Sequence, residues 1–119
     1  MSNEVTWNER VRHLFVQQFA LMVGKQKDYG PNNINAFGEM GVIVRMSDKF
    51  ERLKNLLFSE DEDGNVIWAG DQGAENESVD DTYMDILNYA LIALMVRKGY
   101  WNAPFNAVDA DLLWRGGGA

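Results

Sequence analysis

Two stretches of the chain carry the same pattern: an acidic residue, a charged residue four positions later and an asparagine seven positions later. The members are Asp48, Arg52 and Asn55 in one stretch and Asp81, Asp85 and Asn88 in the other. On a helix of about 3.6 residues per turn, this spacing places the three side chains along one face. In the second stretch two carboxylates lie one turn apart among apolar neighbours, which is unfavourable unless a positive charge lies between them. The pattern therefore predicts a site for a divalent cation that carries phosphate oxygens.

The chemistry of the pattern favours Mg²⁺, or Mn²⁺ in its place. Mg²⁺ prefers oxygen ligands and is usually held by a few carboxylates together with substrate phosphates. We therefore expect Asp48, Asp81 and Asp85 to be metal ligands and the acids of a catalytic site, in which an activated water attacks a phosphoryl group. The alternative is that these residues form solvated helix faces and surface ion pairs.

A group of cations and one aromatic residue is placed to bind a phosphorylated ligand. Lys25 and Lys27 lie at the end of the first predicted helix with Tyr29 just beyond, so the lysines could contact phosphate while the ring stacks on a base. Favourable interaction with the negative end of the helix dipole explains the same lysines equally well. Arg45 and Arg52 could bind phosphate from the second helix, because guanidinium groups match phosphate oxygens in a bidentate way.

Composition limits the kinds of function that the chain can have. The 119 residues carry a formal net charge of −7, whereas a protein that binds the backbone of long nucleic acid is normally basic. There is no cysteine, which excludes disulfides, thiolate zinc sites and a cysteine nucleophile. No apolar run reaches about 18 residues. We therefore expect a cytoplasmic protein that binds a small nucleotide, with no membrane and no long nucleic acid as partner.

Periodicity and capping signals predict an all-α fold. The expected elements are a helix over 7–27, a helix over 35–58, a loop over 59–77, a helix from Ser78 to Gly99, a short helix over 107–114 and a frayed tail over 115–119. Within the acidic loop, residues 66–68 read as a short extended segment. We expect residues 1–119 to form one antiparallel helical bundle. The many aromatic residues also predict a homodimer or higher homo-oligomer.

Three motifs in order resemble the phage-encoded nucleotide-modification-associated domain of the first type, over about residues 10–98. They are Lys25-x-Lys27-Asp28-Tyr29-Gly30, then Gly41-Val42-x-x-Arg45-x-x-Asp48-Lys49-x-x-Arg52-Leu53-x-Asn55-Leu56, then Glu77-Ser78-x-x-Asp81-Thr82-x-x-Asp85-x-x-Asn88-Tyr89-Ala90. More distantly, the chain resembles the MazG-like all-α nucleoside triphosphate pyrophosphohydrolases. That second resemblance implies Mg²⁺, cleavage between the α- and β-phosphates, and assembly of several copies. If the chain is phage-encoded, the location is the host cytoplasm.

The MazG-like resemblance also assigns roles to particular residues. Asp48 matches the last acid of the group's first motif, and Asp85 matches the aspartate of its second. Two positions depart from the group: Arg45 stands where it has a glutamate, and Thr82 stands where it has another, with Asp81 one position earlier as a substitute. An arginine in the first motif weakens the case for several metals and favours direct phosphate binding.

The resemblance leaves three functions open. The first is a metal-dependent pyrophosphohydrolase that converts a (deoxy)nucleoside triphosphate to monophosphate and pyrophosphate. In it Glu77 or Glu51 assists the three aspartates with the metal, and Tyr29, Asn88 or Trp68 contacts the base. The second is a non-catalytic nucleotide binder, such as a sponge for a host signalling nucleotide, and the third is a structural helical protein.

Overall fold

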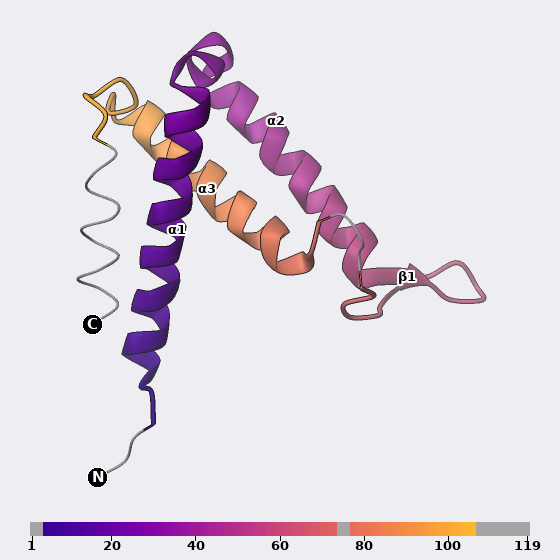
Figure 1. Ribbon diagram of the computed structural model, residues 1–119. Helices are drawn as coiled ribbons and strands as arrows, with labels where there is room; N and C mark the ends of the chain where they lie inside the picture. The colour runs from indigo at the N-terminus through magenta and orange to yellow at the C-terminus, as the bar shows by residue number, and fades with distance from the viewer. Residues whose placement is uncertain (1–3, 74–76, 107–119) are drawn as a thin grey trace. The chain divides into compact units, whose positions relative to one another are not determined.

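The computed structural model describes residues 4–73 and 77–106 and contains three long helices and one small hairpin (Figure 1). The elements are α1 (Trp7–Tyr29), α2 (Asn32–Leu57), β1 (Phe58–Glu60), β2 (Val66–Trp68) and α3 (Val79–Arg97). The predicted all-α class is thus broadly confirmed, with a two-stranded sheet in addition. The predicted helix over 107–114 and the tail over 115–119 lie outside the described residues. No helix in the described part of the chain is both long enough and apolar enough to cross a membrane.

Local capping determines where α1 begins and ends. The side chain of Thr6 accepts a hydrogen bond of 3.2 Å from the backbone N–H of Glu9, which satisfies a donor that the helix leaves without a partner. At the other end Gly30 adopts φ 69° and donates to the carbonyl of Gln26. The predicted end near residue 27 is therefore two residues too early.

Two glycines shape the first turns of α2. Gly38 has φ 64°, a left-handed value that glycine adopts without steric cost, and it divides the helix into a short first part and a long second part. The kink brings the side chain of Phe37 over the next turn, where a Cβ on Gly41 would collide with it. Gly41 is thus required by close packing against Phe37 of its own helix.

The segment predicted as a loop over 59–77 contains a β-hairpin. Strands β1 and β2 pair antiparallel with Ser59 opposite Ile67. In the turn, Oδ1 of Asp61 accepts hydrogen bonds from the backbone N–H groups of Asp63 and Asn65, at 3.0 and 2.8 Å. The prediction of a loop was therefore wrong for residues 59–60, whereas the short extended segment expected at 66–68 is confirmed as β2.

Helix α3 begins and ends as its sequence predicts. Ser78 caps it, since its Oγ accepts a hydrogen bond of 3.0 Å from the N–H of Asp81. At the other end Gly99, with φ 73°, donates to Val96, and Tyr100 donates to Met95. These two bonds form a Schellman motif, which satisfies the last carbonyls of the helix.

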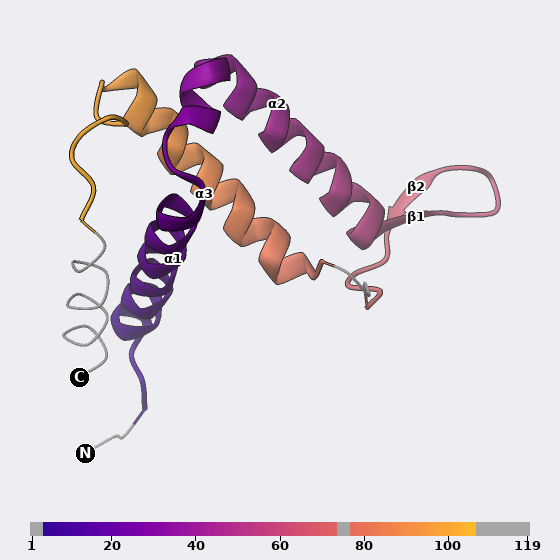
Figure 2. The same cartoon turned by 45° about the horizontal axis from the view of Figure 1, so that its top comes forward.

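The described residues belong to two compact units, one with residues 4–33 and 102–106 and one with residues 34–73 and 77–101. The second unit contains nearly all of α2, the hairpin and α3. Its core joins the end of α2 to the start of α3 through Leu53, Leu57 and Val79, with Leu56 and Ile86 packed against them. Helices α2 and α3 lie side by side in both views (Figure 2). That residues 1–119 form one domain stays a prediction.

Candidate functional site: an ion cluster between two helices

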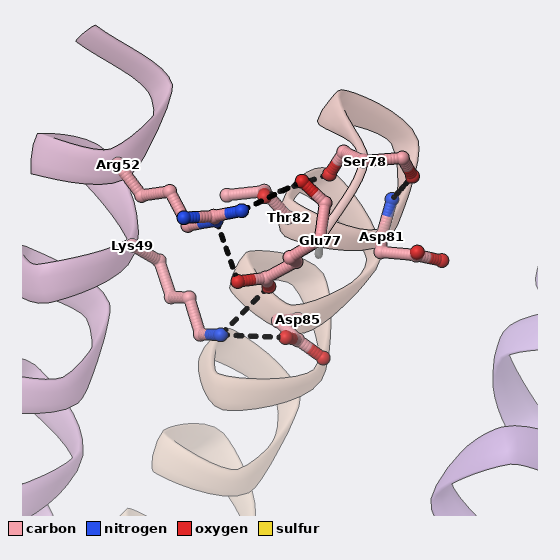
Figure 3. Close-up of polar contacts among 7 residues, drawn as sticks. All are labelled: Lys49, Arg52, Glu77, Ser78, Asp81, Thr82 and Asp85. Carbon is pink, nitrogen blue, oxygen red and sulfur yellow. Dashed lines mark hydrogen bonds and ion pairs between the residues drawn. The ribbon is translucent and has the colours of Figure 1, made fainter. Parts of the chain in front are cut away.

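Lys49 on α2 lies between two carboxylates at the start of α3. Its Nζ is 2.8 Å from Oε1 of Glu77 and 2.8 Å from Oδ2 of Asp85 (Figure 3). The three side chains are between 19% and 24% exposed, so water screens their charges only partly. The ammonium of Lys49 thus bridges two acids, one just before α3 and one in its second turn.

Arg52 holds Glu77 in position through a second set of contacts. Its Nη2 donates a hydrogen bond of 2.8 Å to the backbone carbonyl of Glu77. Its Nε lies 2.7 Å from Oε2 of the same residue, but this N–H is not aligned for a hydrogen bond, so the contact is an ion pair. Arg52 therefore binds both the side chain and the backbone of Glu77, immediately before the Ser78 cap.

Lys49, Arg52, Glu77 and Asp85 form an ion cluster. The hydrophobic core beneath this ion cluster determines which residues of α2 face α3. Leu53 and Leu56 follow Lys49 by four and seven positions and lie on its side of the helix. Because Leu53 packs with Val79, the ammonium of Lys49 is directed towards the first turns of α3. The ion cluster and the core are thus two layers of one helix contact.

The environment raises the pKa of Lys49 above its ordinary value of 10.5. Burial alone would lower the pKa of this ammonium, but hydrogen bonds and charges from Asp85 and Glu77 outweigh that effect. Lys49 is therefore fully protonated near neutral pH, as the shared ion pair requires.

Glu77 and Asp85 are the two acids of the cluster that would hold a divalent cation, if the predicted metal site lies here. Two carboxylate oxygens that are both 2.8 Å from one nitrogen are no farther apart than twice that distance. Mg²⁺ binds oxygens at about 2.0–2.1 Å and usually keeps waters or substrate phosphates as its other ligands. No group of three His, Cys, Asp or Glu side chains within residues 4–73 and 77–106 could hold a metal. A metal site at this cluster therefore stays a prediction.

The structure distributes the predicted metal ligands unevenly. Glu77 and Asp85 converge on Lys49, as described above. Asp48 is exposed, and Asp81 is exposed with a side chain that points away from Lys49 and Arg52 (Figure 3). Asp81 serves the cap through its backbone N–H. The metal-ligand and catalytic roles of these four acids stay predictions.

The predicted nucleotide-binding residues lie in both units. Arg52 is in the ion cluster, Arg45 is half-buried on α2, and Asn88 is buried on α3. Oδ1 of Asn88 has no hydrogen-bond partner among the residues that the structure describes. Lys25, Lys27 and Tyr29 lie on α1, in the other unit, where Tyr29 is strongly exposed. Their contact with a nucleotide stays a prediction.

Sequence reasoning missed Lys49, the central residue of the cluster. The signal was present, because Lys49 precedes Leu53 by four positions and so shares the apolar face of α2. A lysine on that face needs an acidic partner, and the acids ahead of the next helix are the obvious candidates.

A second charge contact joins the opposite ends of the two helices. Nη1 of Arg97 donates to both carboxylate oxygens of Glu39, at 2.8 and 2.9 Å. Glu39 is near the start of α2 and Arg97 ends α3, whereas the ion cluster joins the end of α2 to the start of α3. The two contacts together show that the helices run antiparallel.

Fold and site together define a mostly helical protein in which an antiparallel helix pair presents a shared ion cluster. The chain belongs to the family described as nucleotide modification associated domain 1, whose model matches residues 25–96. That range includes all of the ion cluster. Comparisons with curated proteins and with solved structures found no significant match.

Proposed function

We propose that the protein is a metal-dependent nucleotide pyrophosphohydrolase that acts on a (deoxy)nucleoside triphosphate. The observation that supports the proposal best is the convergence of Glu77 and Asp85 on one cation, in a family associated with nucleotide modification. Two acids that already face a positive charge need little rearrangement to face a different one.

Glu77 and Asp85 would hold Mg²⁺ or Mn²⁺ with the phosphates of the substrate. When bound, the ion would polarise the phosphoryl oxygens and lower the pKa of a bound water. Arg52 keeps Glu77 in place through its carboxylate and its carbonyl, so one ligand is pre-oriented. Lys49 lies beside both acids and supplies a cation for the phosphates.

The proposed reaction breaks one phosphoanhydride bond. Water attacks the α-phosphorus, the bond from that phosphorus to the oxygen bridging the β-phosphorus breaks, and monophosphate and pyrophosphate leave. The proton of the attacking water would pass to solvent, because Asp48 is exposed and the side chain of Asp81 points away from Lys49 and Arg52 (Figure 3).

A second function, non-catalytic nucleotide binding, is supported by one specific observation. Lys49 and Arg52 already neutralise the two converging acids, and no third acid joins them within the described residues. A sponge for a signalling nucleotide would use the cations of the cluster and would need no metal.

The proposal includes association of identical chains. Four apolar residues on one side of α2, Met40, Ile43, Val44 and Phe50, are between 49% and 76% exposed. An apolar surface of this kind is usually covered in the assembled protein. Light scattering after size exclusion should give a mass above that of one 13.5 kDa chain, and a monomeric mass would contradict this part of the proposal.

The direct test is to incubate the protein with the eight common nucleoside triphosphates and Mg²⁺ or Mn²⁺. Chromatography should show monophosphate and pyrophosphate from at least one of them. Asp85→Asn should abolish the release, and Asp80→Asn should retain it, because Asp80 is an exposed acid on the same helix outside the cluster.

The same assay in EDTA separates the two functions. Tight binding of an intact nucleotide in EDTA, with no turnover in Mg²⁺ or Mn²⁺, would favour the sponge over the enzyme. No binding and no turnover under any condition would contradict both.

A further inference from the structure

We propose that β2 is an edge at which two copies of this chain associate. In this arrangement β2 pairs antiparallel with β2 of a second copy, about a two-fold axis at Ile67, and the two hairpins form one continuous sheet. The inference deepens one part of the proposed function, the association of identical chains, and rests on that part. It depends on no metal and on no residue of the ion cluster.

Hydrogen bonds at both ends of the hairpin determine the direction of its backbone groups. The N–H of Ala69 donates to the carbonyl of Leu57 at 2.8 Å, and the N–H of Asp61 donates to the carbonyl of Asn65 at 2.9 Å. Residues opposite each other in an antiparallel ladder alternate between hydrogen-bonded and non-hydrogen-bonded pairs. The pair halfway between these two ends is therefore hydrogen-bonded as well.

The same alternation leaves the outer edge of β2 open. Ser59 and Ile67 are the central pair, so the N–H and C=O groups of Val66 and Trp68 point away from β1. Within residues 4–73 and 77–106 none of these outward groups has a hydrogen bond. The hairpin extends from the end of α2 in both views (Figures 1 and 2). It therefore presents at β2 an unpaired edge, the kind of edge to which another strand adds.

The outer edge of β1 is different, because a side chain of the same chain binds there. Nε2 of Gln72 donates to the carbonyls of Leu56 and Phe58, at 3.3 and 3.4 Å. The carbonyl of Phe58 belongs to the outer edge of β1, since Phe58 lies opposite Trp68 in a non-hydrogen-bonded pair. Part of that edge is thus covered, which leaves β2 as the edge for a second copy.

The side chains of β2 also favour a neighbouring strand. Val66 and Trp68 are 69% and 65% exposed. They share a face with Phe58, whose ring meets that of Trp68 edge-to-face with the centroids 5.4 Å apart. In antiparallel pairing about Ile67, Val66 lies opposite the partner's Trp68. Pairs of an aromatic and a β-branched residue on neighbouring strands stabilise a sheet, so the pairing covers the two most exposed apolar side chains of the hairpin.

The occupant that fits this edge is a second copy, because β2 is complementary to itself. Rotation about Ile67 exchanges Val66 and Trp68, so each outward N–H of one copy meets an outward C=O of the other. Glu62 and Asp63, in the turn, are exposed. Antiparallel pairing keeps the two acidic turns at opposite ends of the sheet, whereas parallel pairing would bring them together. Strands of three residues bury little area, so this edge is one part of the contact between copies.

The direct test uses a single introduced thiol, because the chain contains no cysteine. Ile67→Cys places a thiol at the two-fold axis, where a non-hydrogen-bonded antiparallel pair has Cα atoms about 4.5 Å apart, within reach of a disulfide. With oxidised glutathione this variant should form a covalent dimer. Electrophoresis without reductant measures the rate, and dithiothreitol should reverse the product.

Glu60→Cys is the matched control for random collision. Glu60 is exposed on β1, which is the outer strand of the paired sheet. Three strand spacings, about 14 Å, then separate its position from the same position in the partner. It should therefore cross-link at least about tenfold more slowly than Ile67→Cys. Equal rates in the two variants would overturn the proposed pairing.

A second measurement tests the hydrogen bonds of the edge. Val66→Pro removes only an outward N–H and leaves the pairing of β1 with β2 intact, so it should weaken self-association in sedimentation equilibrium by at least about tenfold. Val66→Thr retains the N–H and the branched side chain and should associate as the native protein does. Circular dichroism checks that both variants keep their helices. Unchanged association in a folded Val66→Pro would also overturn the pairing.

The inference and the association on which it rests fail in different ways. A native protein that is monomeric at every concentration would contradict both, and would leave the edge to an extended segment of another protein. Self-association of the native protein without faster cross-linking of Ile67→Cys would overturn the pairing at β2 and leave the association standing. Neither result bears on the nucleotide reaction, which the incubation with triphosphates tests separately.

Discussion

The two ends of the α2–α3 pair are both joined by opposite charges, but they are built differently. At the end of α2, two cations and two acids share contacts in a half-buried cluster. At the start of α2, one glutamate meets one arginine whose side chain is 68% exposed. The ion cluster is a network of four charged residues, whereas Glu39 and Arg97 form a single ion pair.

The difference shows which contact the fold needs for helix pairing. Leu53, Leu57 and Val79 already hold the end of α2 against α3 beneath the cluster. Burial of such side chains stabilises a fold far more than partly exposed ion pairs do. The core therefore contributes more than the charges of the cluster do to joining these helix ends.

The largest expected effect comes from removing an acid of the cluster. Glu77→Gln should weaken Mn²⁺-dependent nucleotide binding by about 100-fold, because one ligand of the proposed metal is lost. Isothermal titration with α,β-methylene analogues of the four common deoxynucleoside triphosphates, which cannot be cleaved at that bond, measures this affinity in the presence of Mn²⁺. Glu39→Gln is the matched control at the other end of the pair and should bind as the native protein does. Equal affinities of the two variants would contradict the assignment of function to the cluster.

The next effect is on stability at the same end. Arg52→Met should lower the free energy of unfolding by about 1.5–3 kcal/mol, the range for hydrogen bonds to charged groups, because Glu77 loses partners for its carboxylate and its carbonyl. Urea denaturation followed by circular dichroism measures it. Lys54→Met, which removes only an exposed pair, should change stability by less. A loss in Arg52→Met no greater than in this control would show that Arg52 does not hold Glu77.

The start of α1 and the two ends of α3 could be predicted because their signals are local, whereas the end of α1 and the start of α2 were each misplaced by two or three residues. Thr6, Ser78 and Gly99 each act on backbone groups within a few residues, so their types and spacing were sufficient. The first strand and its pairing were missed because strands of three residues carry little periodicity, although the extended segment at 66–68 was expected.

The site could be predicted only in part, because the rotation of α2 about its axis is a tertiary property. Neighbouring residues on a helix point about 100° apart. If the face of α2 that packs on α3 is assigned wrongly by that angle, Asp48 rather than Lys49 is expected to face α3. The core through Leu53 and Leu57 selects Lys49. The sequence named Glu77 and Asp85 among its proposed metal ligands, a role that stays a prediction, but it could not show that a lysine lies between them.

A smaller effect on stability is expected from breaking the ion pair between Glu39 and Arg97. Arg97→Met should lower the free energy of unfolding by about 0.2–1 kcal/mol, because the arginine is mostly exposed and water screens its charge. Denaturant unfolding measures the change, and nucleotide binding should be unaffected. A loss as large as that of Arg52→Met would mean that the two ends do not differ as their exposure implies.

The smallest effect is a dependence of stability on alkaline pH, which again separates the two ends. In the folded protein the pKa of Lys49 is raised above its ordinary value of 10.5, so its ion pairs contribute fully below that pH. As pH rises through the raised value the ammonium deprotonates and the contribution is lost. Between about pH 9 and about pH 12 the free energy of unfolding should therefore fall more steeply in the native protein than in Lys49→Met. Arg97→Met retains Lys49 and should fall as steeply as the native protein. Parallel curves for the native protein and Lys49→Met would show that the two carboxylates do not stabilise the charged form of Lys49.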